Sequence, residues 1–394
     1  MIRASARSVV VFTLLAAHPV VAAAQDRPAL QAIPVYVSAP APRVPAPAPA
    51  TVRGIFINAW GFGSSRFHHL VRLADTTEIN AFVIDVKDDT GYLTYRSAVP
   101  TALAIGANGQ LRAPDARARL ALMRDKGIHA IARIVVAKDP LLARQKSDWA
   151  VRHRDGGLWA DRLRFHWVDA FHDSVWVYAA QLAEEAVQLG FDEIQYDYVR
   201  FPDEPRSRLA TAIFAARRGE ESSREGVRRN LALLAQRTRA LGVPFTIDVF
   251  GLTTSATGDM GIGQVWEDLV GTADVVLPMV YPSHYYAGVY GVAHPNSEPY
   301  RMVRRALEDG LRRNAAVPGA AEIRPFLQAF TLGPPRYTPW HIREQIRAVE
   351  DAGLHSWVLW NPRSAYDPAI FRPATGASRA AAASPDSIPP DSLR

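Results

Sequence analysis

Residues 190–202 have the sequence GFDEIQYDYVRFP, which reads as a buried strand interrupted by Asp197. Gly190 closes the helical pattern before it, because glycine readily adopts the backbone conformation that ends a helix. An ionised carboxylate inside an apolar run costs several kcal/mol unless a partner or a function compensates for it. Asp197 therefore has a partner or a chemical role, and its place in the fold decides between them.

Seven further runs rich in valine, isoleucine and phenylalanine are similar to the quoted strand. They are VRGIFINAW (52–60), INAFVIDVKDD (79–89), IHAIARIVV (128–136), PFTIDVFGLTT (244–254), ADVVLPMVYP (273–282), RPFLQAFTLG (324–333) and HSWVLWNP (355–362). Nearly continuous hydrophobicity of this kind is typical of parallel strands that are covered on both faces.

Helical patterns separate these eight runs, and several of them end in a glycine just before the next strand, at Gly127, Gly190, Gly242 and Gly353. Eight alternating strands and helices predict an α/β fold, the closed (β/α)8 or TIM barrel, as a single domain with long βα loops. An open doubly wound sheet is the alternative. Residues 61–66, GFGSSR, do not match the GxGxxG phosphate turn that favours that alternative.

The two ends of the chain differ in composition from the core. Residues 1–25 carry arginines, then a short apolar run and three alanines, the order of a secretory signal peptide, with an uncleaved anchor as the alternative. Residues 26–50 form a proline- and alanine-rich linker and residues 372–394 a similar tail, and both are predicted to be disordered. We therefore expect a folded domain over residues 51–371 of an exported protein, periplasmic or secreted, with no membrane-spanning segment after signal cleavage.

Composition argues against several classes of function. The chain has no cysteine, so disulfides, thiolate nucleophiles and thiolate metal ligands are absent. Its net charge of +6 comes from dispersed basic residues, which argues against a nucleic-acid partner. The eleven histidines are scattered, and neither HExxH nor GxSxG occurs. The sequence therefore predicts no metal, no cofactor and no serine-hydrolase site.

In a TIM barrel the active site lies at the C-terminal ends of the strands. Near that end, each run has a polar or aromatic residue unlike its neighbours. These residues are Asn58 with Trp60, Asp85 with Lys87, Arg133, Asp197, Asp248, Tyr281, Gln328 and Trp360. Because every run has such a residue at a similar distance from its C-terminal end, the sequence predicts a polar pocket that closes the barrel.

Some of these residues also have structural explanations. Asn58 and Gln328 could be core amides whose hydrogen bonds are satisfied. Arg133 could be a counter-ion of Asp85 or Asp197 as readily as a substrate contact. The carboxylate of Asp85 could also hold a neighbouring lysine or cap a loop. These alternatives stay open from sequence alone.

Asp197 and Asp248 are the candidate catalytic residues, because they end adjacent strands and each has apolar neighbours. Two carboxyl groups that face one cavity are the minimal equipment for hydrolysis of a glycosidic bond, one ionised and one protonated. Lys87, Arg133 and Arg200 could keep Asp197 charged. We therefore assign Asp197 as nucleophile or charge stabiliser and Asp248 as general acid/base.

Aromatic residues in the predicted βα loops suit a carbohydrate substrate. Trp149, Trp159 and Trp167 follow the third strand, and residues 281–300, YPSHYYAGVYGVAHPNSEPY, follow the sixth. Sugars place their apolar C–H faces on flat rings while their hydroxyls bond to polar side chains. The loop aromatics could instead pack beneath their own loops.

The core also resembles a family of bacterial barrel proteins described as "putative glycoside hydrolases", which is distantly related to the α-amylase-type barrels. The resemblance covers residues 52–366. The stretches that carry it are GIFINAW (54–60), FVIDVKDDTG (82–91), GFDEIQYDYVRFP (190–202), DVFGLTT (248–254), DMGIGQVWED (259–268) and LPMVYPSHY (277–285).

The resemblance to amylase-type barrels implies roles for particular residues. Their nucleophile ends the fourth strand, which matches Asp197, and their acid/base ends the fifth, which matches Asp248. The chain departs from the pattern because that acid is usually glutamate, and because Gln328 stands where those enzymes keep a third aspartate. Glu267 and Asp85 are therefore substitute candidates for the acid.

The fourth strand is also similar to the chitinase signature DGxDxDxE, with Asp192 and Asp197 at its first and last aspartates. Gln195 replaces the middle aspartate, and Val199 stands where that signature has its catalytic glutamate. A chitinase mechanism needs that glutamate as its acid. The likeness therefore indicates shared barrel geometry only.

These observations predict a glycoside hydrolase that cleaves O-glycosidic bonds of a poly- or oligosaccharide with two carboxyl groups. The predicted substrate-binding residues are Asn58, Trp60, Asp85, Lys87, Arg133, Arg200, Glu267, Tyr281 and Trp360. The alternative is a glycan-binding or cell-envelope-associated barrel without catalytic activity.

Overall fold

The quoted stretch forms strand β5 (Glu193–Asp197) in the computed structural model, which describes residues 44–374. Helix α6 (Asp173–Leu189) precedes β5 and ends at Gly190, whose φ of 142° is readily reached by glycine alone. The expected signal peptide, most of the expected linker and most of the expected tail lie outside the described residues.

The barrel strands are parallel throughout. Besides β5 they are β1 (Arg53–Ile57), β2 (Ala81–Lys87), β3 (His129–Val135), β7 (Phe245–Phe250), β8 (Val275–Met279), β10 (Phe326–Gln328) and β11 (Trp357–Trp360). They pair in the order β1-β2-β3-β5-β7-β8-β10-β11, and β11 pairs with β1 to close the ring. The short strand β9 (Glu322–Ile323) extends the pairing on β8. Each of the eight apolar runs supplies one strand, which confirms the predicted (β/α)8 barrel.

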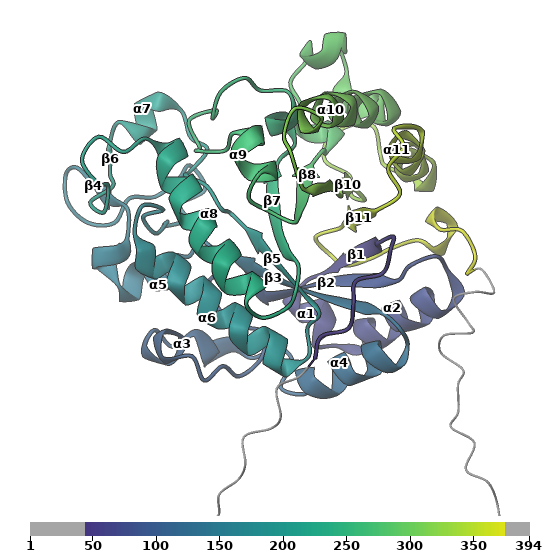
Figure 1. Cartoon of the computed structure of the whole chain (residues 1–394), viewed down its shortest axis with the longest axis horizontal. Helices are drawn as coiled ribbons and strands as arrows, with labels where there is room; N and C mark the ends of the chain where they lie inside the picture. Colours follow the sequence, from purple (N-terminus) through teal and green to yellow (C-terminus); the bar gives the residue numbers. More distant parts are fainter. Residues whose placement is uncertain (1–43, 375–394) are drawn as a thin grey trace, which may run out of the picture. The chain divides into compact units, whose positions relative to one another are not determined.

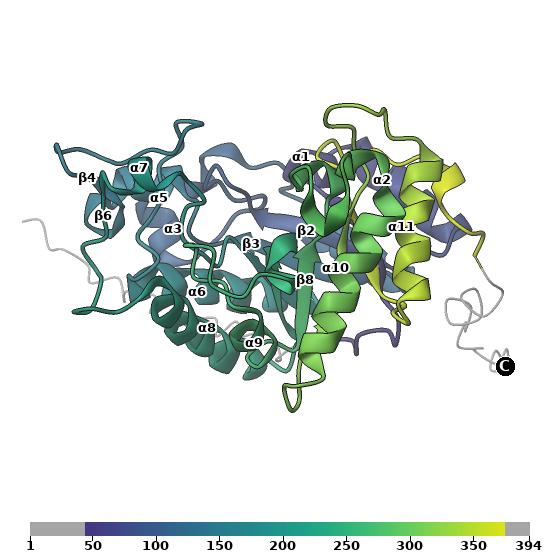
Figure 2. The same cartoon turned by 90° about the horizontal axis from the view of Figure 1, so that it is seen from above.

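Helices surround the strands (Figure 1). The longer ones are α2 (Ser65–Thr76), α4 (Ala116–Asp125), α6, α8 (Ser223–Arg239), α10 (Pro299–Asn314) and α11 (Pro339–Asp351). Short helices in the connections are α1 (Ala59–Phe62), α3 (Pro100–Ala104), α5 (Pro140–Gln145), α7 (Arg206–Leu209) and α9 (Trp266–Val270). Helices α10 and α11 lie side by side (Figure 2). Between residues 44 and 374, no helix has the length and apolar character needed to cross a membrane.

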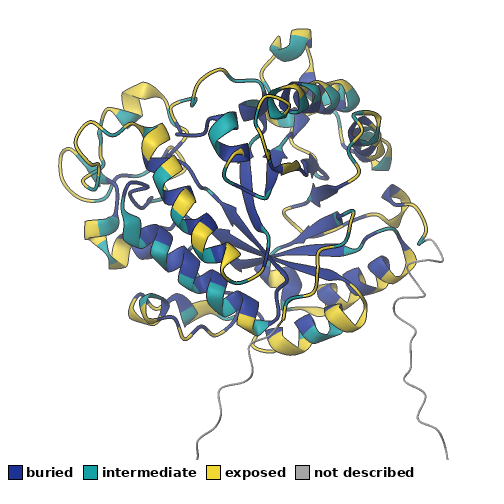
Figure 3. Ribbon diagram, viewed as in Figure 1, coloured by how far each residue is buried: buried dark blue, intermediate teal, exposed yellow. Residues whose placement is uncertain are grey.

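Burial follows the layers expected for this fold. The strands are buried along their length, while the outer helices expose one side and bury the other (Figure 3). This banding arises because each helix presents its apolar stripe to the strands and its charged side chains to water. The barrel is therefore covered on its outside by a continuous apolar layer.

The long connection after β3 packs against the connection after β5. Strands β4 (Arg152–His153) and β6 (Ala212–Ile213) pair antiparallel within these loops. Trp159 and Trp167 are buried, and their Nε1 atoms donate to Thr211 Oγ1 at 3.2 Å and to Asp161 Oδ2 at 3.0 Å. These two tryptophans therefore shape the loops from beneath and do not line an open groove.

Side chains alternate between the barrel interior and the helix layer. Apolar side chains in the interior include Phe56, Val83, Ile131, Leu277 and Val358. Strand β5 differs, because Glu193, Gln195 and Asp197 share its interior face, while Ile194 and Tyr196 belong to the helix-side core. These three polar side chains thus form a column along the interior face of β5, from its N-terminal to its C-terminal end.

Glu193 lies at the N-terminal end of that column and is fully paired. Its carboxylate accepts hydrogen bonds from Arg324 Nη1 and Thr246 Oγ1, each at 2.7 Å, and lies 3.0 Å from His129 Nε2. Burial alone raises the pKa of Glu193, but Arg324 and His129 outweigh it and lower the pKa to about 2. The lower end of the barrel is therefore held by a buried ion cluster.

Candidate active site

A cavity of about 720 Å³ lies at the C-terminal ends of the barrel strands. Five different strands contribute to its lining, through Arg133, Asp197, Phe250, Met279 and Trp360. Parallel strands in a barrel all end at the same face, so their last interior side chains meet there. This is the position at which TIM barrels carry their active sites.

Arg133 forms the floor of the cavity together with three carboxyl groups. Its Nη1 donates to Asp85 Oδ1 at 2.6 Å, and its Nε donates to Asp197 Oδ2 at 3.1 Å. The same Nε lies 3.7 Å from Asp248 Oδ2. Because Asp197 and Asp248 both approach one nitrogen atom, their carboxyl groups are neighbours. The structure thus brings the two candidate catalytic residues together.

The two aspartates differ in access to the cavity. Asp197 lines the cavity although it is only 4% exposed, whereas Asp248 is 1% exposed and lies behind the lining. Both carboxyl oxygens of Asp248 accept from Gln195 Nε2, at 2.9 and 3.0 Å. Of the two carboxyl groups, Asp197 therefore faces the cavity, and Asp248 lies behind it.

The floor holds protons at neutral pH. Burial, and then the charge of Asp197, raise the pKa of Asp248 well above its usual value. Burial also raises the pKa of Asp85 to about 7, against the opposing effect of Arg133. Burial alone would lower the pKa of Arg133, but the three carboxylates reverse this and raise it. A charged guanidinium therefore faces carboxyl groups that are in part protonated.

The backbone after Asp197 adopts a rare conformation. Tyr198 has a φ of 54°, in the left-handed region that side chains other than glycine seldom occupy. Its backbone N–H donates to Asp197 Oδ1 at 2.5 Å, and its carbonyl oxygen accepts from the N–H of Ala137 at 3.2 Å. Such conformations persist only where their surroundings hold them, and they cluster at functional sites. Here the turn aims a donor at the carboxylate that faces the cavity.

Aromatic side chains form the walls of the cavity. Trp360 stacks on Phe56 with ring centroids 3.7 Å apart, and the Arg133 guanidinium lies 4.9 Å from the Trp360 ring. Tyr281 and Tyr285 also line the cavity, and within residues 44–374 no hydrogen-bond partner reaches the buried hydroxyl of Tyr281. Unpaired buried hydroxyls cost free energy that a ligand can recover.

Exposed apolar side chains surround the mouth of the cavity. Leu163, Tyr286 and Leu332 are 68%, 81% and 53% exposed, and all three belong to its lining. They come from three separate loops. Apolar groups that gather around a polar pocket are typical of a binding surface.

The structure gives Asn58 and Gln328 local roles. Asn58 caps α1, because its side chain accepts from the N–H of Gly61 at 2.7 Å and donates to the carbonyl of Pro362 at 2.7 Å. Gln328 accepts from the N–H of Ser283 at 3.0 Å. Neither amide lies in the cavity lining. Both side chains therefore fit the alternative that they are structural amides with satisfied hydrogen bonds.

Trp60 and Lys87 also lie outside the cavity lining. Trp60 is 66% exposed on α1, and the guanidinium of Arg112 lies 5.0 Å from its ring. Lys87 is buried and donates to Asp139 Oδ2 at 2.6 Å. The pairing of β2 with β3 shifts register between Asp85 and Lys87. Strict alternation of side chains along β2 predicted Lys87 on the same face as Asp85, and the shift breaks that alternation.

Two of the described carboxyl groups line the cavity, those of Asp197 and Asp203. Glu267, a substitute acid in the sequence analysis, lies on α9 and accepts from Arg313 Nε and Nη2 at 2.7 and 2.6 Å. Asp85, the other substitute, is bound to Arg133 behind the floor. Sequence alone did not single out Asp203, because it follows β5 in an irregular loop with no periodic pattern.

Other lining residues were also missed. They include Tyr198, Phe250, Tyr285 and Phe330. Phe250 and Phe330 follow the strand alternation, but an aromatic residue in an apolar run gives no signal by itself. Tyr285 lies in the aromatic stretch that follows β8, which the sequence singled out as a segment and not residue by residue.

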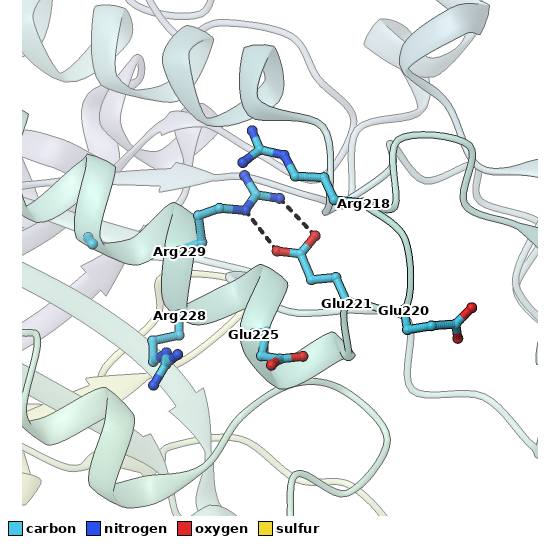
Figure 4. A pocket seen from close by; sticks show the side chains of 7 residues that line it. Arg218, Glu220, Glu221, Glu225, Arg228 and Arg229 are labelled. Carbon is cyan, nitrogen blue, oxygen red and sulfur yellow. Dashed lines mark hydrogen bonds and ion pairs between the residues drawn. The ribbon is translucent and has the colours of Figure 1, made fainter.

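A second cavity, of about 620 Å³, lies at the start of α8. Figure 4 shows its charged side chains, in which Glu221 accepts from Arg229 Nε at 2.8 Å and from Nη2 at 3.2 Å. Glu225 belongs to the capping box of α8. Because these groups satisfy one another, this cavity is a weaker candidate. Within the described part of the chain, no group of three or more histidine or acidic residues is arranged to hold a metal ion.

The comparisons with known proteins identify the family. A family model described as "Putative glycosyl hydrolase domain" matches residues 54–366, from β1 to the segment beyond β11. The chain belongs to this family. It is therefore a glycoside hydrolase by family, with a substrate that the match does not name.

Solved structures show the same barrel. The glycoside hydrolase domain of PgaB (BpsB) from Bordetella bronchiseptica is 13% identical, with 80% of this chain and 95% of that one covered and a TM-score of 0.56. Alpha-L-fucosidase isoenzyme 2 from Paenibacillus thiaminolyticus is 16% identical, with 81% and 47% covered and a TM-score of 0.51.

A hypothetical protein from Ruminiclostridium thermocellum is 37% identical to this chain, and its structure matches with a TM-score of 0.42. The match covers 46% of this chain and 92% of the other protein. No curated protein matches the sequence.

Proposed function

We propose that this member of the glycosyl hydrolase family cleaves O-glycosidic bonds of a poly- or oligosaccharide with Asp197 and Asp248 as its two acting carboxyl groups. The observation that carries the proposal is the shared guanidinium of Arg133, which Asp197 meets from the cavity side and Asp248 from behind. Two carboxyl groups in contrasting surroundings are what a glycosidase needs.

Asp197 acts on the anomeric carbon in this proposal. Its Oδ2 accepts from Arg133 Nε and Nη2, and its Oδ1 accepts from the N–H of Tyr198. These donors suit an ionised carboxylate that attacks the sugar or stabilises its oxocarbenium-like transition state. Trp360 and Tyr281 then bound the space in which the sugar ring lies.

Asp248 holds the proton in this proposal, because its pKa is raised by burial and by Asp197. Its side chain does not line the cavity, so its proton reaches a leaving oxygen only if the side chain moves towards the cavity, while Asp197 stays ionised. Asp203 lines the cavity and is exposed. We propose Asp203 as the second candidate for direct proton donation to the leaving group.

Three asparagine variants test these roles. Asp197→Asn is expected to lower kcat at least about 100-fold on every glycan that the wild type cleaves. The residue that protonates the leaving oxygen is identified by its substrate dependence. Its asparagine variant loses activity on natural linkages but keeps it on nitrophenyl glycosides, whose leaving groups need no proton. Asp203→Asn and Asp248→Asn are compared in this way.

The alternative is a glycan-binding barrel without turnover, and the buried position of Asp248 motivates it. A wild type that binds one glycan of a broad polysaccharide panel yet releases no reducing ends from any would support that alternative. An Asp197→Asn variant as active as the wild type would refute the role proposed for that carboxylate.

We also propose that the protein is exported to the periplasm or secreted, because residues 1–25 have the order of a signal peptide. The proposal is tested with a fusion of residues 1–50 to a reporter that folds only outside the cytoplasm. An inactive, cytoplasmic reporter would contradict it.

A further inference from the structure

Arg200 lies in the cavity wall with part of its guanidinium unused. It is 8% exposed, and its Nη1 donates to the carbonyl of Phe201 at 3.0 Å. Its Nε is buried, and neither Nε nor Nη2 has a hydrogen-bond partner within residues 44–374. No carboxylate of the described chain forms an ion pair with it. A buried arginine in this state is unusual, because an unpaired charge away from water is costly.

Three aromatic rings hold the guanidinium in place. Its central carbon lies 4.6 Å from the ring of Phe250, 4.7 Å from that of Tyr198 and 5.2 Å from that of Trp167. Cation–π contacts of this kind restrain the side chain and supply part of its stabilisation. They leave the in-plane donors without acceptors.

The unused edge is the one that this chain elsewhere gives to carboxylates. Arg224, Arg229, Arg237, Arg239 and Arg313 each direct Nε and Nη2 to the carboxylate of a single acidic residue. This pair of parallel donors matches the two oxygens of a carboxylate. In Arg200 the same edge has no acceptor within residues 44–374. Its Nε is buried, so Nη2 is the donor that a carboxylate in the candidate active site meets, and Arg200 belongs to the lining of that site.

The acidic residues around Arg200 do not replace a bound anion. Asp197 is engaged by Arg133, and Asp161 accepts from Trp167 Nε1 and from backbone N–H groups. Asp203 lines the same cavity without contacting the guanidinium. Burial lowers the pKa of Arg200, and the charges of Tyr198, Asp197 and Asp203 oppose that effect from a distance.

We propose that Arg200 binds a carboxylate carried by the sugar, so that the substrate of this site is an acidic polysaccharide that contains hexuronic acid. The inference rests on the proposed function, because it concerns the same cavity. The hydroxyl of Tyr281 is left to bind a neutral hydroxyl of the sugar. Arg200 is thus a specificity residue, and the reacting bond lies at Asp197.

The test compares oligosaccharides that contain hexuronic acid with the same oligosaccharides after their carboxyl groups have been reduced to primary alcohols. Binding to the full chain is followed by tryptophan fluorescence, and hydrolysis by release of reducing ends. The wild type is expected to bind the acidic form at least about 10-fold more tightly, as a charge-assisted hydrogen-bond pair implies. Arg200→Met is expected to remove that preference, so that its affinities for the acidic and reduced forms differ about twofold or less.

Two further variants keep the result interpretable. Arg200→Lys keeps the charge and loses the paired donors, so it is expected to retain a smaller preference for the acidic form. Arg224→Met removes a paired surface arginine of α8 and is expected to behave as the wild type with both forms. Circular dichroism of each variant separates loss of binding from loss of folding.

The outcomes distinguish this inference from the proposed function. Equal binding of acidic and reduced forms by the wild type overturns the inference, even if both are hydrolysed. Preferential binding without hydrolysis supports the inference and removes the proposed activity. Binding of sulfated oligosaccharides in place of uronates would overturn the assignment to a carboxylate.

Discussion

Arg133 cannot neutralise three carboxylates at once. Asp85, Asp197 and Asp248 approach it from three strands, all away from water. The arrangement is stable only because protons replace the missing cations on Asp85 and Asp248, where burial raises the pKa. The floor of the candidate active site therefore has a protonation state that depends on pH.

Asp85→Asn is expected to change how stability depends on pH. The pKa of Asp85 is raised from 3.8 to about 7 in the folded protein, so its contribution to stability is complete below pH 3.8 and is lost as pH rises towards 7. The shift corresponds to about 4 kcal/mol across that range. The asparagine variant should lose this slope, which denaturant titrations between pH 4 and 8 measure. An unchanged slope would contradict the raised pKa.

Arg133→Met is expected to destabilise the protein by about 3–5 kcal/mol, because it leaves buried carboxylates without a cation. The loss should grow as pH rises, since more of the carboxyl groups must then ionise. Arg347→Met provides the control, because Arg347 forms an exposed pair with Glu344 and should cost about 1 kcal/mol or less. Equal effects of the two substitutions, measured by urea unfolding, would show that the floor pairs contribute no more than a surface pair.

At the scale of the elements, the strands could be predicted because each is an apolar run long enough to be buried on both faces. Alternation along those runs also placed Arg133, Asp197, Tyr281 and Trp360 at the cavity. It placed Asp248 beside Asp197, but it could not show that Asp248 lies behind the lining, because depth depends on how neighbouring strands pack.

Where prediction of the lining failed, local irregularity was the cause. The register shift in β2 moves Lys87 to Asp139, and the cap of α1 uses Asn58. Asp203 lies in a loop whose path depends on tertiary contacts, and the loop sequence has no hydrophobic periodicity from which the direction of a side chain could be predicted. The buried tryptophans after β3 show the same limit, because hydrophobic residues in a loop do not reveal whether they face solvent or the loop itself.

Gly251 joins β7 to the loop above the cavity and leaves no room for a side chain. A Cβ atom there would lie 2.3 Å from the carbonyl oxygen of Met279 and 2.7 Å from the hydroxyl of Tyr285. Gly251→Ala is therefore expected to destabilise the fold by about 1–3 kcal/mol and to lower activity by displacing lining residues. Gly258→Ala is the matched control, because nothing lies within 4 Å of its added Cβ. Thermal unfolding and hydrolysis assays of both variants check this, and a silent Gly251→Ala would refute the steric account.

At the scale of the whole barrel, the ion cluster at the lower end determines behaviour in acid. The pKa of Glu193 is lowered from 4.5 to about 2, so its contribution to stability is present above pH 4.5 and is lost as pH falls towards 2. That contribution corresponds to about 3 kcal/mol. Its sign is opposite to that of Asp85, so stability should pass through a maximum where the two ranges overlap, between pH 3.8 and 4.5.

Glu193→Gln is expected to lower stability by about 3–5 kcal/mol near pH 6, because His129 then lies buried without a carboxylate and Arg324 keeps only its longer ion pair with Glu322. Glu322→Gln removes a half-exposed partner of the same arginine and should cost about 1 kcal/mol or less. Guanidinium unfolding at pH 3 and pH 6 checks the difference, since the effect of Glu193→Gln should shrink at the lower pH. A constant difference would contradict the role given to the ionised carboxylate.

The polar column on β5 also has a consequence for how the chain reaches its native state. Side chains in a strand alternate, so a slip of one residue would turn Glu193, Gln195 and Asp197 together into the apolar layer beneath the helices. That pairing would separate Glu193 from Arg324, Gln195 from Asp248 and Asp197 from Arg133, and so leave buried charges without partners. The polar side chains of β5 thus also specify the register in which this strand pairs with its neighbours.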